Sequence, residues 1–339
     1  MRRLRLTILT ITAFSVLAIP ATASAAMKMA IEDESVFVSG NPVVSSTQGY
    51  QMLNDLKIKT MRVLITQASV ASGGGFDFTS YLNTLQQAKE NGVTVQVVLV
   101  GKYPRPNISS YAKFAKAAAQ ALGGQVTFYS IWNEPNLNAW IKGSNKGAIY
   151  RRIYTAGYKA IKQGDRTAKV LMGETSPFVD RSPGLAPLKF LRQLACVDTN
   201  YRPLRGKKCP ALTASGYAHH PYDLDRAPGR SNRGKDSATI GTLSNLTRAL
   251  GKLRGRLRGT RSVYLTEFGY ASQGPHKLPE ARRATYLKQA VGIARRTRGM
   301  KQLVQYLLIN ASRDPFPTGL LTPAGVRTRS YAALKAANR

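Results

Sequence analysis

The sequence is 339 residues long, with 43% hydrophobic and 20% charged residues, proportions typical of a globular protein rather than a disordered chain. Its 50 Lys and Arg against 17 Asp and Glu give a formal net charge of +33 at pH 7. Two cysteines and three histidines exclude a disulfide-dense miniprotein and a four-cysteine zinc site, and we expect neither a metal nor a cofactor.

The first 26 residues are typical of a secretory signal peptide. Three arginines among the first five residues precede an apolar stretch over 6–19, and an Ala-Ser-Ala cleavage sequence ends at residue 25. A membrane span takes roughly 20 residues, so a single N-terminal anchor is the less favoured alternative. We therefore expect a secreted protein with one catalytic domain over 27–339.

Eight short apolar or β-branched runs follow, and they alternate with stretches of helical periodicity. The predicted strands cover Met29–Ile31, Thr60–Ile65, Thr94–Val100, Val126–Trp132, Lys169–Met172, Ala214–Ala218, Ser262–Thr266 and Leu303–Ile309.

The intervening segments have apolar residues at helical spacing, as at Tyr81, Leu85 and Ala88 before Asn91-Gly92. Strands as continuously apolar as 95–100 suit a parallel sheet covered by helices. Eight β–α units favour an α/β fold with a single (β/α)8 (TIM) barrel. An open doubly wound sheet is the runner-up, but no G-x-G-x-x-G follows a predicted strand.

The two cysteines, Cys196 and Cys209, flank a loop-like segment rich in Tyr, Pro and Lys. Export to an oxidising compartment favours a disulfide between them, stabilising the fold by about 3 kcal/mol. Two unpaired thiols are the alternative.

Two glutamates stand where barrel active sites lie, at the C-terminal ends of strands. Glu134 ends the fourth predicted strand and Glu267 the seventh. Facing carboxyl groups suit glycoside hydrolysis, in which one protonates the leaving oxygen and the other acts at the anomeric carbon. Arg62 in the second strand would keep one of them ionised. Exposed acids and a structural ion pair are the alternatives.

The motifs around these glutamates resemble those of a known group of enzymes. Trp-Asn-Glu-Pro-Asn at 132–136 and Thr-Glu-Phe-Gly-Tyr at 266–270 are similar to the clan A retaining glycoside hydrolases, particularly families 5 and 39, over roughly residues 28–337. The resemblance implies that Glu134 is the general acid/base and Glu267 the nucleophile. It also implies that Asn133 contacts the sugar 2-hydroxyl.

Supporting residues follow from the same resemblance. Arg62 and the His220-Pro221-Tyr222 sequence match the arginine and His-x-Tyr that support the nucleophile in the clan. Trp140, six residues beyond Glu134, is expected to form a sugar platform, with packing beneath its loop as the alternative.

One position departs from the clan's pattern. The usual tryptophan at the end of the eighth strand is missing, because the two tryptophans of the sequence are Trp132 and Trp140. Either another aromatic residue such as Phe316 takes its place, or the subsite is remodelled.

The positive charge is densest over 252–261 and 295–301, at the C-terminal ends of predicted helices and therefore away from the active-site end of a barrel. A solvated surface is the favoured explanation, followed by attachment to an anionic cell-wall polymer. No nucleic-acid motif accompanies the charge, so we expect no specific nucleic-acid partner. We also expect a monomer.

The sequence thus predicts a secreted, retaining O-glycosyl hydrolase of poly- or oligosaccharides. The rival hypothesis is a catalytically inactive, carbohydrate-binding barrel, which the missing tryptophan favours. The presence of Asn133, Glu134, Tyr222 and Glu267 together argues against it.

Overall fold

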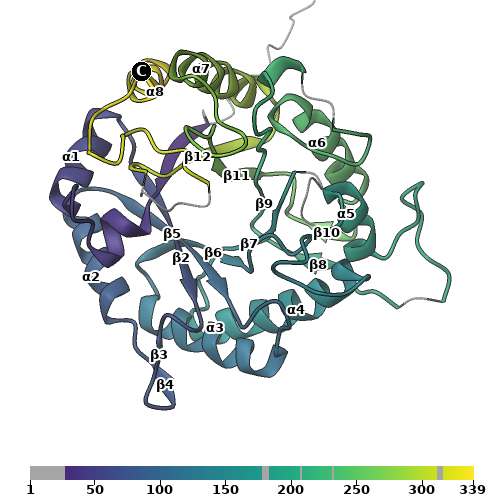
Figure 1. Cartoon of the computed structure of the whole chain (residues 1–339). Helices are drawn as coiled ribbons and strands as arrows, with labels where there is room; N and C mark the ends of the chain where they lie inside the picture. The colour runs from purple at the N-terminus through teal and green to yellow at the C-terminus, as the bar shows by residue number, and fades with distance from the viewer. Residues whose placement is uncertain (1–26, 178–182, 207, 231–232, 311–315) are drawn as a thin grey trace, which may run out of the picture.

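Eight parallel strands close into a barrel inside a ring of helices (Figure 1). This computed structural model describes residues 27–177, 183–206, 208–230, 233–310 and 316–339. The predicted (β/α)8 barrel is confirmed. The predicted signal peptide lies outside the described residues, and within them no helix is long and apolar enough to cross a membrane.

The barrel strands lie around the barrel in the order of the chain. They are β1 (Lys28–Glu32), β2 (Thr60–Thr66), β5 (Thr94–Val100), β6 (Val126–Ile131), β7 (Val170–Thr175), β9 (Gly216–His219), β11 (Val263–Phe268) and β12 (Met300–Tyr306). Each pairs with its neighbours in the chain, and β1 closes the barrel against β12. Two small additions lie outside the barrel, the hairpin of β3 (Ala71–Ser72) with β4 (Gly75–Phe76) and the pair of β8 (Leu212–Thr213) with β10 (Leu257–Arg258).

The helices are α1 (Ser46–Asp55), α2 (Thr79–Glu90), α3 (Ile108–Leu122), α4 (Lys146–Gly164), α5 (Pro187–Ala195), α6 (Leu243–Lys252), α7 (Glu280–Arg296) and α8 (Arg329–Ala337). Short helical turns, η1 (Ser35–Ser39), η2 (Pro228–Arg230) and η3 (Ile240–Thr242), interrupt the loops.

The main core lies between the barrel and the helices. In α3 the Asn107 side chain accepts a hydrogen bond from the amide of Ser110 and caps the helix. Tyr111 and Phe114 then share one buried face, and the Tyr111 hydroxyl donates to the Leu99 carbonyl at 3.0 Å. The strand β5 is buried along nearly its whole length, because one of its faces packs against helices and the other fills the barrel.

The last barrel strand lies three residues earlier than the apolar pattern predicts. It ends at Tyr306, because Leu307 adopts a left-handed φ of 66°. The amides of Leu308 and Ile309 instead donate to one carboxylate oxygen of Asp33, each at 3.0 Å. Residues 307–309 are apolar because they are buried, and hydrophobicity does not distinguish a buried strand from a buried loop.

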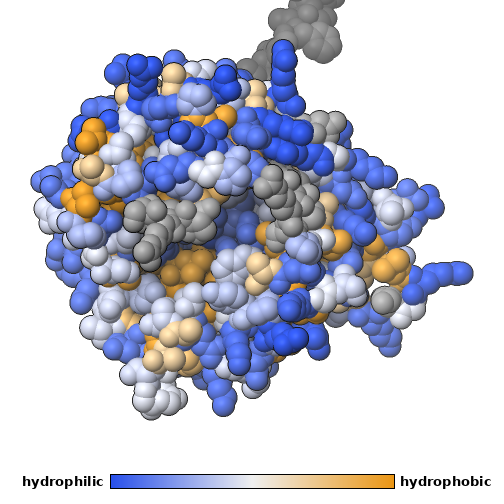
Figure 2. Space-filling model, in the orientation of Figure 1, coloured by the Kyte–Doolittle hydropathy of each residue, from blue (hydrophilic) through white to orange (hydrophobic). Residues whose placement is uncertain are grey.

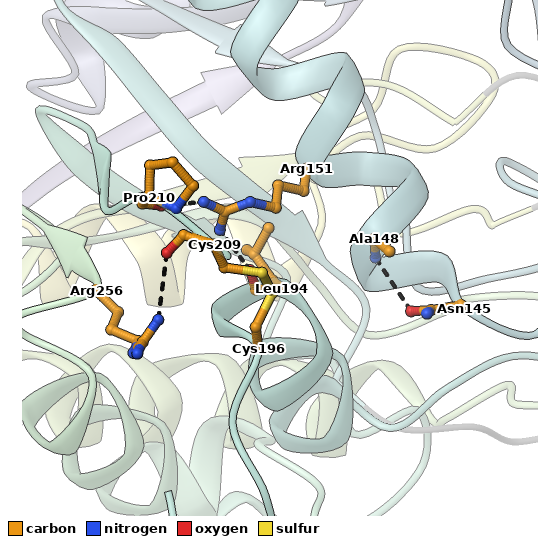
Figure 3. Close-up of a disulfide and its surroundings, with 8 residues drawn as sticks. All are labelled: Asn145, Ala148, Arg151, Leu194, Cys196, Cys209, Pro210 and Arg256. Atoms are coloured by element: carbon orange, nitrogen blue, oxygen red, sulfur yellow. Dashed lines mark hydrogen bonds between the residues drawn. A yellow bond between two sulfur atoms is a disulfide. The ribbon is translucent and has the colours of Figure 1, made fainter. Parts of the chain in front are cut away.

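The predicted disulfide between Cys196 and Cys209 is present, and it closes the loop that protrudes beside α5 (Figures 1 and 3). Replacing both cysteines with serine should lower the free energy of unfolding by about 3 kcal/mol, because the unfolded chain gains freedom. Urea unfolding of the two proteins measures this difference. Non-reducing peptide mapping of the purified protein that recovered both thiols free would contradict the bridge.

Candidate active site

The molecule is hollowed near the centre of the face seen in Figure 2, inside the ring of helices. The residues predicted to be functional come from β2 and from the C-terminal ends of three further barrel strands, β6, β9 and β11. The structure brings Arg62, Asn133, Glu134, His220, Tyr222 and Glu267 together through direct contacts.

A bulge in β11 aims two consecutive side chains into the barrel. Between Leu265 and Phe268 the strand advances three residues while its partner β12 advances two. The extra residue breaks the alternation of faces. Thr266 and Glu267 therefore both contact the site, Thr266 through a 2.6 Å hydrogen bond to Glu174 and Glu267 through a 2.9 Å ion pair with Arg62.

Another bulge places Glu174 at the centre of the site. The register between β7 and β9 shifts between Gly173 and Thr175, and Glu174 has a left-handed φ of 52°. A Cβ atom on Gly173 would lie 2.4 Å from the carbonyl of Ala218, so only glycine fits before this bend.

Glu134 follows β6 on a loop with unusual backbone geometry. Trp132 has a φ of 71° and Glu134 a φ of 35°, both in the left-handed region. The Trp132 indole is fully buried, and it packs edge-on against Tyr111 at 5.4 Å. Such backbone strain persists only where packing fixes it, and it gathers at functional sites.

The Arg62 guanidinium organises the site from β2. It is fully buried and lies 2.9 Å from Glu267 and 3.2 Å from Glu174, and it is also paired with Glu32. Its Nη2 atom donates to the Asn133 side-chain oxygen at 3.2 Å. One arginine thus fixes three carboxylates and the Asn133 amide.

His220 joins the two predicted catalytic carboxylates. Its Nδ1 atom lies 3.2 Å from Glu134 and 3.4 Å from Glu267, while its Nε2 atom lies 2.8 Å from Glu174. Burial disfavours the charged imidazolium, but the negative charges of Glu267, Glu134 and Glu174 outweigh it and raise the pKa of His220 to about 10. The ring is therefore protonated at neutral pH.

The neighbouring His219 has the opposite environment. It faces away from the site, as expected, and contacts the Thr175 hydroxyl at 2.9 Å and the Ala238 carbonyl at 2.5 Å. Complete burial lowers its pKa to about 3. Two consecutive histidines at the end of β9 therefore differ in charge, because one ring contacts the carboxylates and the other contacts Thr175 and the Ala238 carbonyl.

The charges of Arg62 and His220 also fix the state of Glu174. Burial alone would raise the pKa of Glu174, but these two cations lower it from 4.5 to about 2. At Glu32 burial prevails and the pKa lies well above its usual value, despite the contact with Arg62.

Comparison with solved structures reveals extensive likeness in fold. A family 39 glycoside hydrolase from the gut symbiont Bacteroides cellulosilyticus WH2 matches 91% of this chain with a TM-score of 0.68 at 16% sequence identity. The match covers 63% of that protein, so the chain spans under two thirds of its length. A glucosidase from Croceicoccus marinus matches 92% of this chain and 68% of its own, with a TM-score of 0.66 at 12% identity.

A thermostable mutant of a xylanase from Cellvibrio japonicus matches 92% of this chain and 97% of its own, with a TM-score of 0.58 at 13% identity. This chain has the fold of the clan A glycoside hydrolases. Neither the protein-family models nor the curated proteins contain a match.

The position of the clan's missing strand-8 tryptophan has an aromatic neighbour here. Phe316 packs edge-on against Tyr222 with their ring centroids 4.8 Å apart, and the Tyr222 hydroxyl donates to Glu267 at 3.2 Å. Phe316 thus contacts the tyrosine that binds the predicted nucleophile, and its use in place of the tryptophan stays a prediction.

Trp140 lies on the loop after β6 and packs against Tyr103 from the loop after β5, with ring centroids 4.7 Å apart. Its backbone carbonyl accepts a hydrogen bond from the Trp132 indole at 3.3 Å. Trp140 is half-buried and Tyr103 is exposed, so the two rings form a partly exposed aromatic surface on the loops after β6 and β5. Its use as a sugar platform stays a prediction.

Two acidic residues of the site were not predicted from the sequence. Glu32 ends β1 and pairs with Arg62, and Glu34 accepts a 2.6 Å hydrogen bond from the Leu64 amide. Burial raises the pKa of Glu34 to about 7. The Glu-Asp-Glu triplet directly after a predicted strand was the signal that could have revealed them.

The site is built from ion pairs and not from metal ligands. Within the described ranges no group of three or more His, Cys, Asp or Glu residues could hold a metal ion. The basic runs lie elsewhere, since 252–261 ends just before β11 and 295–301 includes the first two residues of β12, both at the N-terminal ends of these strands.

Replacing Glu174 with glutamine should lower the free energy of unfolding by about 3–5 kcal/mol at pH 7, because Arg62 and the His220 imidazolium lose a buried carboxylate that contacts both. The pKa of Glu174 is depressed, so its stabilisation is complete above about pH 4.5 and is lost as the pH falls through about 2.

Urea unfolding at pH 7 and at pH 3 measures the difference, which should shrink at the lower pH. The exposed Glu90, replaced in the same way, is the control and should change stability little. An equal loss at both pH values would show that the carboxylate charge does not stabilise the site.

Proposed function

We propose that this protein is a secreted glycoside hydrolase that cleaves O-glycosidic bonds of a poly- or oligosaccharide with retention of configuration. One observation carries the proposal: Glu134 and Glu267 both contact Nδ1 of His220, at 3.2 and 3.4 Å. The two contacting oxygens, one from each glutamate, therefore lie no farther apart than the sum of these distances. That limit is compatible with the roughly 5–5.5 Å that separates the two catalytic carboxyl groups in retaining enzymes. It only just reaches the lower end of the roughly 6.5–9.5 Å separation in inverting enzymes.

In the first step Glu267 attacks the anomeric carbon, while Glu134 donates its proton to the departing glycosidic oxygen. The bond between sugar and leaving group breaks as the glycosyl–Glu267 ester forms. Arg62 holds Glu267 at 2.9 Å and the Tyr222 hydroxyl donates to its other oxygen at 3.2 Å, which aims the nucleophile.

In the second step Glu134, now ionised, removes a proton from a water molecule that attacks the anomeric carbon. The ester breaks, Glu267 regains its charge, and the second inversion restores the original configuration. Asn133 is held by Arg62 at 3.2 Å, which orients its amide toward the sugar 2-hydroxyl. The His220 imidazolium holds both glutamates in place and stabilises the negative charge that moves between them.

A screen for released reducing ends on a panel of polysaccharides, with products identified by mass spectrometry, tests for activity. Proton NMR of the first-formed product then tests the stereochemistry. Release of sugar with the starting anomeric configuration is expected. No release from any polysaccharide or aryl glycoside would favour the inactive carbohydrate-binding barrel, and an inverted first product would refute the role of Glu267.

A further inference from the structure

A second hollow, of about 580 Å³, lies outside the barrel among α4, α5 and the loop closed by the disulfide. We call it the loop pocket. Its size falls within the roughly 300–1,000 Å³ of typical ligand sites. The apolar part of its lining includes Ile149, Val197, Leu204 and the disulfide itself. Leu204 is one of the few large apolar side chains that the described structure leaves exposed.

The rim of the loop pocket is strongly cationic. Arg152 from α4, Lys189 from α5 and Lys208 from the disulfide loop all line it, and all three side chains are exposed. Among the described residues none of the three forms a close ion pair with an acid, although Lys189 lies near enough to help Arg192 lower the pKa of Asp236. Asp198 is the one acid in the lining.

The wall beside the disulfide is cationic as well. Arg151 donates to the carbonyls of Leu194 and Pro210, and Arg256 donates to the Cys209 carbonyl at 3.3 Å (Figure 3). Burial and the nearby charge of Arg256 lower the pKa of Arg151. The disulfide loop is thus fixed by two arginines that form no ion pair with a carboxylate in the described part of the chain, and their field extends into the pocket.

We propose that the loop pocket is a second, non-catalytic binding site for an acidic polysaccharide, a chain of pyranose rings that carry carboxylate or sulfate groups. The apolar floor offers a surface for the CH face of a ring, and the rim offers Arg152, Lys189 and Lys208 to its anionic groups. Binding here holds the protein on an anionic matrix while the barrel mouth stays free.

The lining fits this ligand better than a nucleic acid. Single-stranded nucleic acids bind grooves in which aromatic side chains stack on the bases. The described lining of the loop pocket contains no aromatic residue. Tyr201, in the same loop, has cations over its ring, with Lys252 at 4.9 Å and Arg192 at 5.8 Å from the centroid.

Two triple variants that remove the same charge test the proposal. The pocket triple is Arg152→Gln, Lys189→Gln and Lys208→Gln. The control triple is Lys89→Gln, Lys113→Gln and Arg298→Gln, three exposed cations on α2, on α3 and just after α7 that do not line the loop pocket. Binding to polygalacturonate and to dextran sulfate is measured at about 0.15 M salt, where long-range attraction is screened. Neutral dextran and double-stranded DNA are the comparison probes.

The pocket triple should weaken binding to an acidic polysaccharide about tenfold or more, and the control triple less than about threefold. Polygalacturonate and dextran sulfate distinguish carboxylate from sulfate as the anionic group. Leu204→Ser leaves the charge unchanged and should also weaken binding, because it removes part of the floor. All variants should keep the activity of the unmodified protein on a small neutral glycoside.

Equal losses in the two triples would show that diffuse surface charge attracts the polymer, and would overturn the proposal. A pocket triple that lost DNA binding as strongly as polysaccharide binding, or unmodified protein that bound neither acidic polysaccharide, would overturn it too. These outcomes are independent of turnover, so they do not depend on whether the barrel is a glycosidase.

Discussion

Replacing Glu267 with alanine should lower kcat by about 10⁴-fold or more on every glycoside substrate, because the proposed mechanism needs its carboxylate to form the glycosyl ester. The remaining partners of Arg62, which are Glu32, Glu174 and Asn133, stay in place and should keep the barrel folded. Initial rates on the best substrate of the polysaccharide screen, with thermal unfolding of the same samples, measure both expectations.

The matched control is Glu90→Ala, which removes an exposed carboxylate at the end of α2 and should leave kcat unchanged. Glu267→Gln retains the shape of the side chain, and it should be as inactive as the alanine variant because the amide is a poor nucleophile. A Glu267→Gln variant with near-normal turnover would remove Glu267 from the mechanism.

Replacing Glu134 with alanine should have an effect that depends on the leaving group. A natural glycosidic oxygen needs protonation as it departs, so hydrolysis of oligosaccharides should slow by about 10²–10⁴-fold. An aryl glycoside with a strongly acidic phenol departs without help, so formation of the glycosyl–Glu267 ester should be nearly unaffected. A rapid burst of phenol followed by slow turnover is the expected kinetic trace.

Azide added to the Glu134→Ala variant should restore turnover of the activated aryl glycoside and yield a glycosyl azide of retained configuration, because a small anion needs no general base. The Glu267→Ala variant is the matched control, and any azide product from it should have the opposite configuration. Equal slowing of activated and natural substrates by Glu134→Ala would show that Glu134 is not the acid.

Much of this architecture could be read from local patterns. Apolar runs such as Thr94–Val100 alternate with helical periodicity eight times, and burial of both faces of a parallel sheet leaves that pattern in any barrel. Glu134, Glu267, Arg62 and His220 were recognisable because strand ends and their motifs are local in the chain. The disulfide followed from having two cysteines.

The tertiary structure decided the features that depend on how the strands pair and on which residues become buried. The bulges at Gly173–Thr175 and Leu265–Phe268 aim Glu174 and Glu267 into one site, and a bulge is a mismatch between two strands that one strand's sequence does not reveal. The ends of β12 and the loop pocket likewise arise from contacts between segments distant in sequence.

The sequence by itself determined which chemical groups the barrel carries, because the identity of each side chain and its position along a strand are local properties of the chain. Their charge states were decided by the fold. His220 is a cation and His219 neutral because the first ring contacts three carboxylates and the second is buried in contact with none, although they are adjacent residues at the end of β9. A pKa depends on the distance to other charges and on access to water, and both are set only when the chain closes on itself.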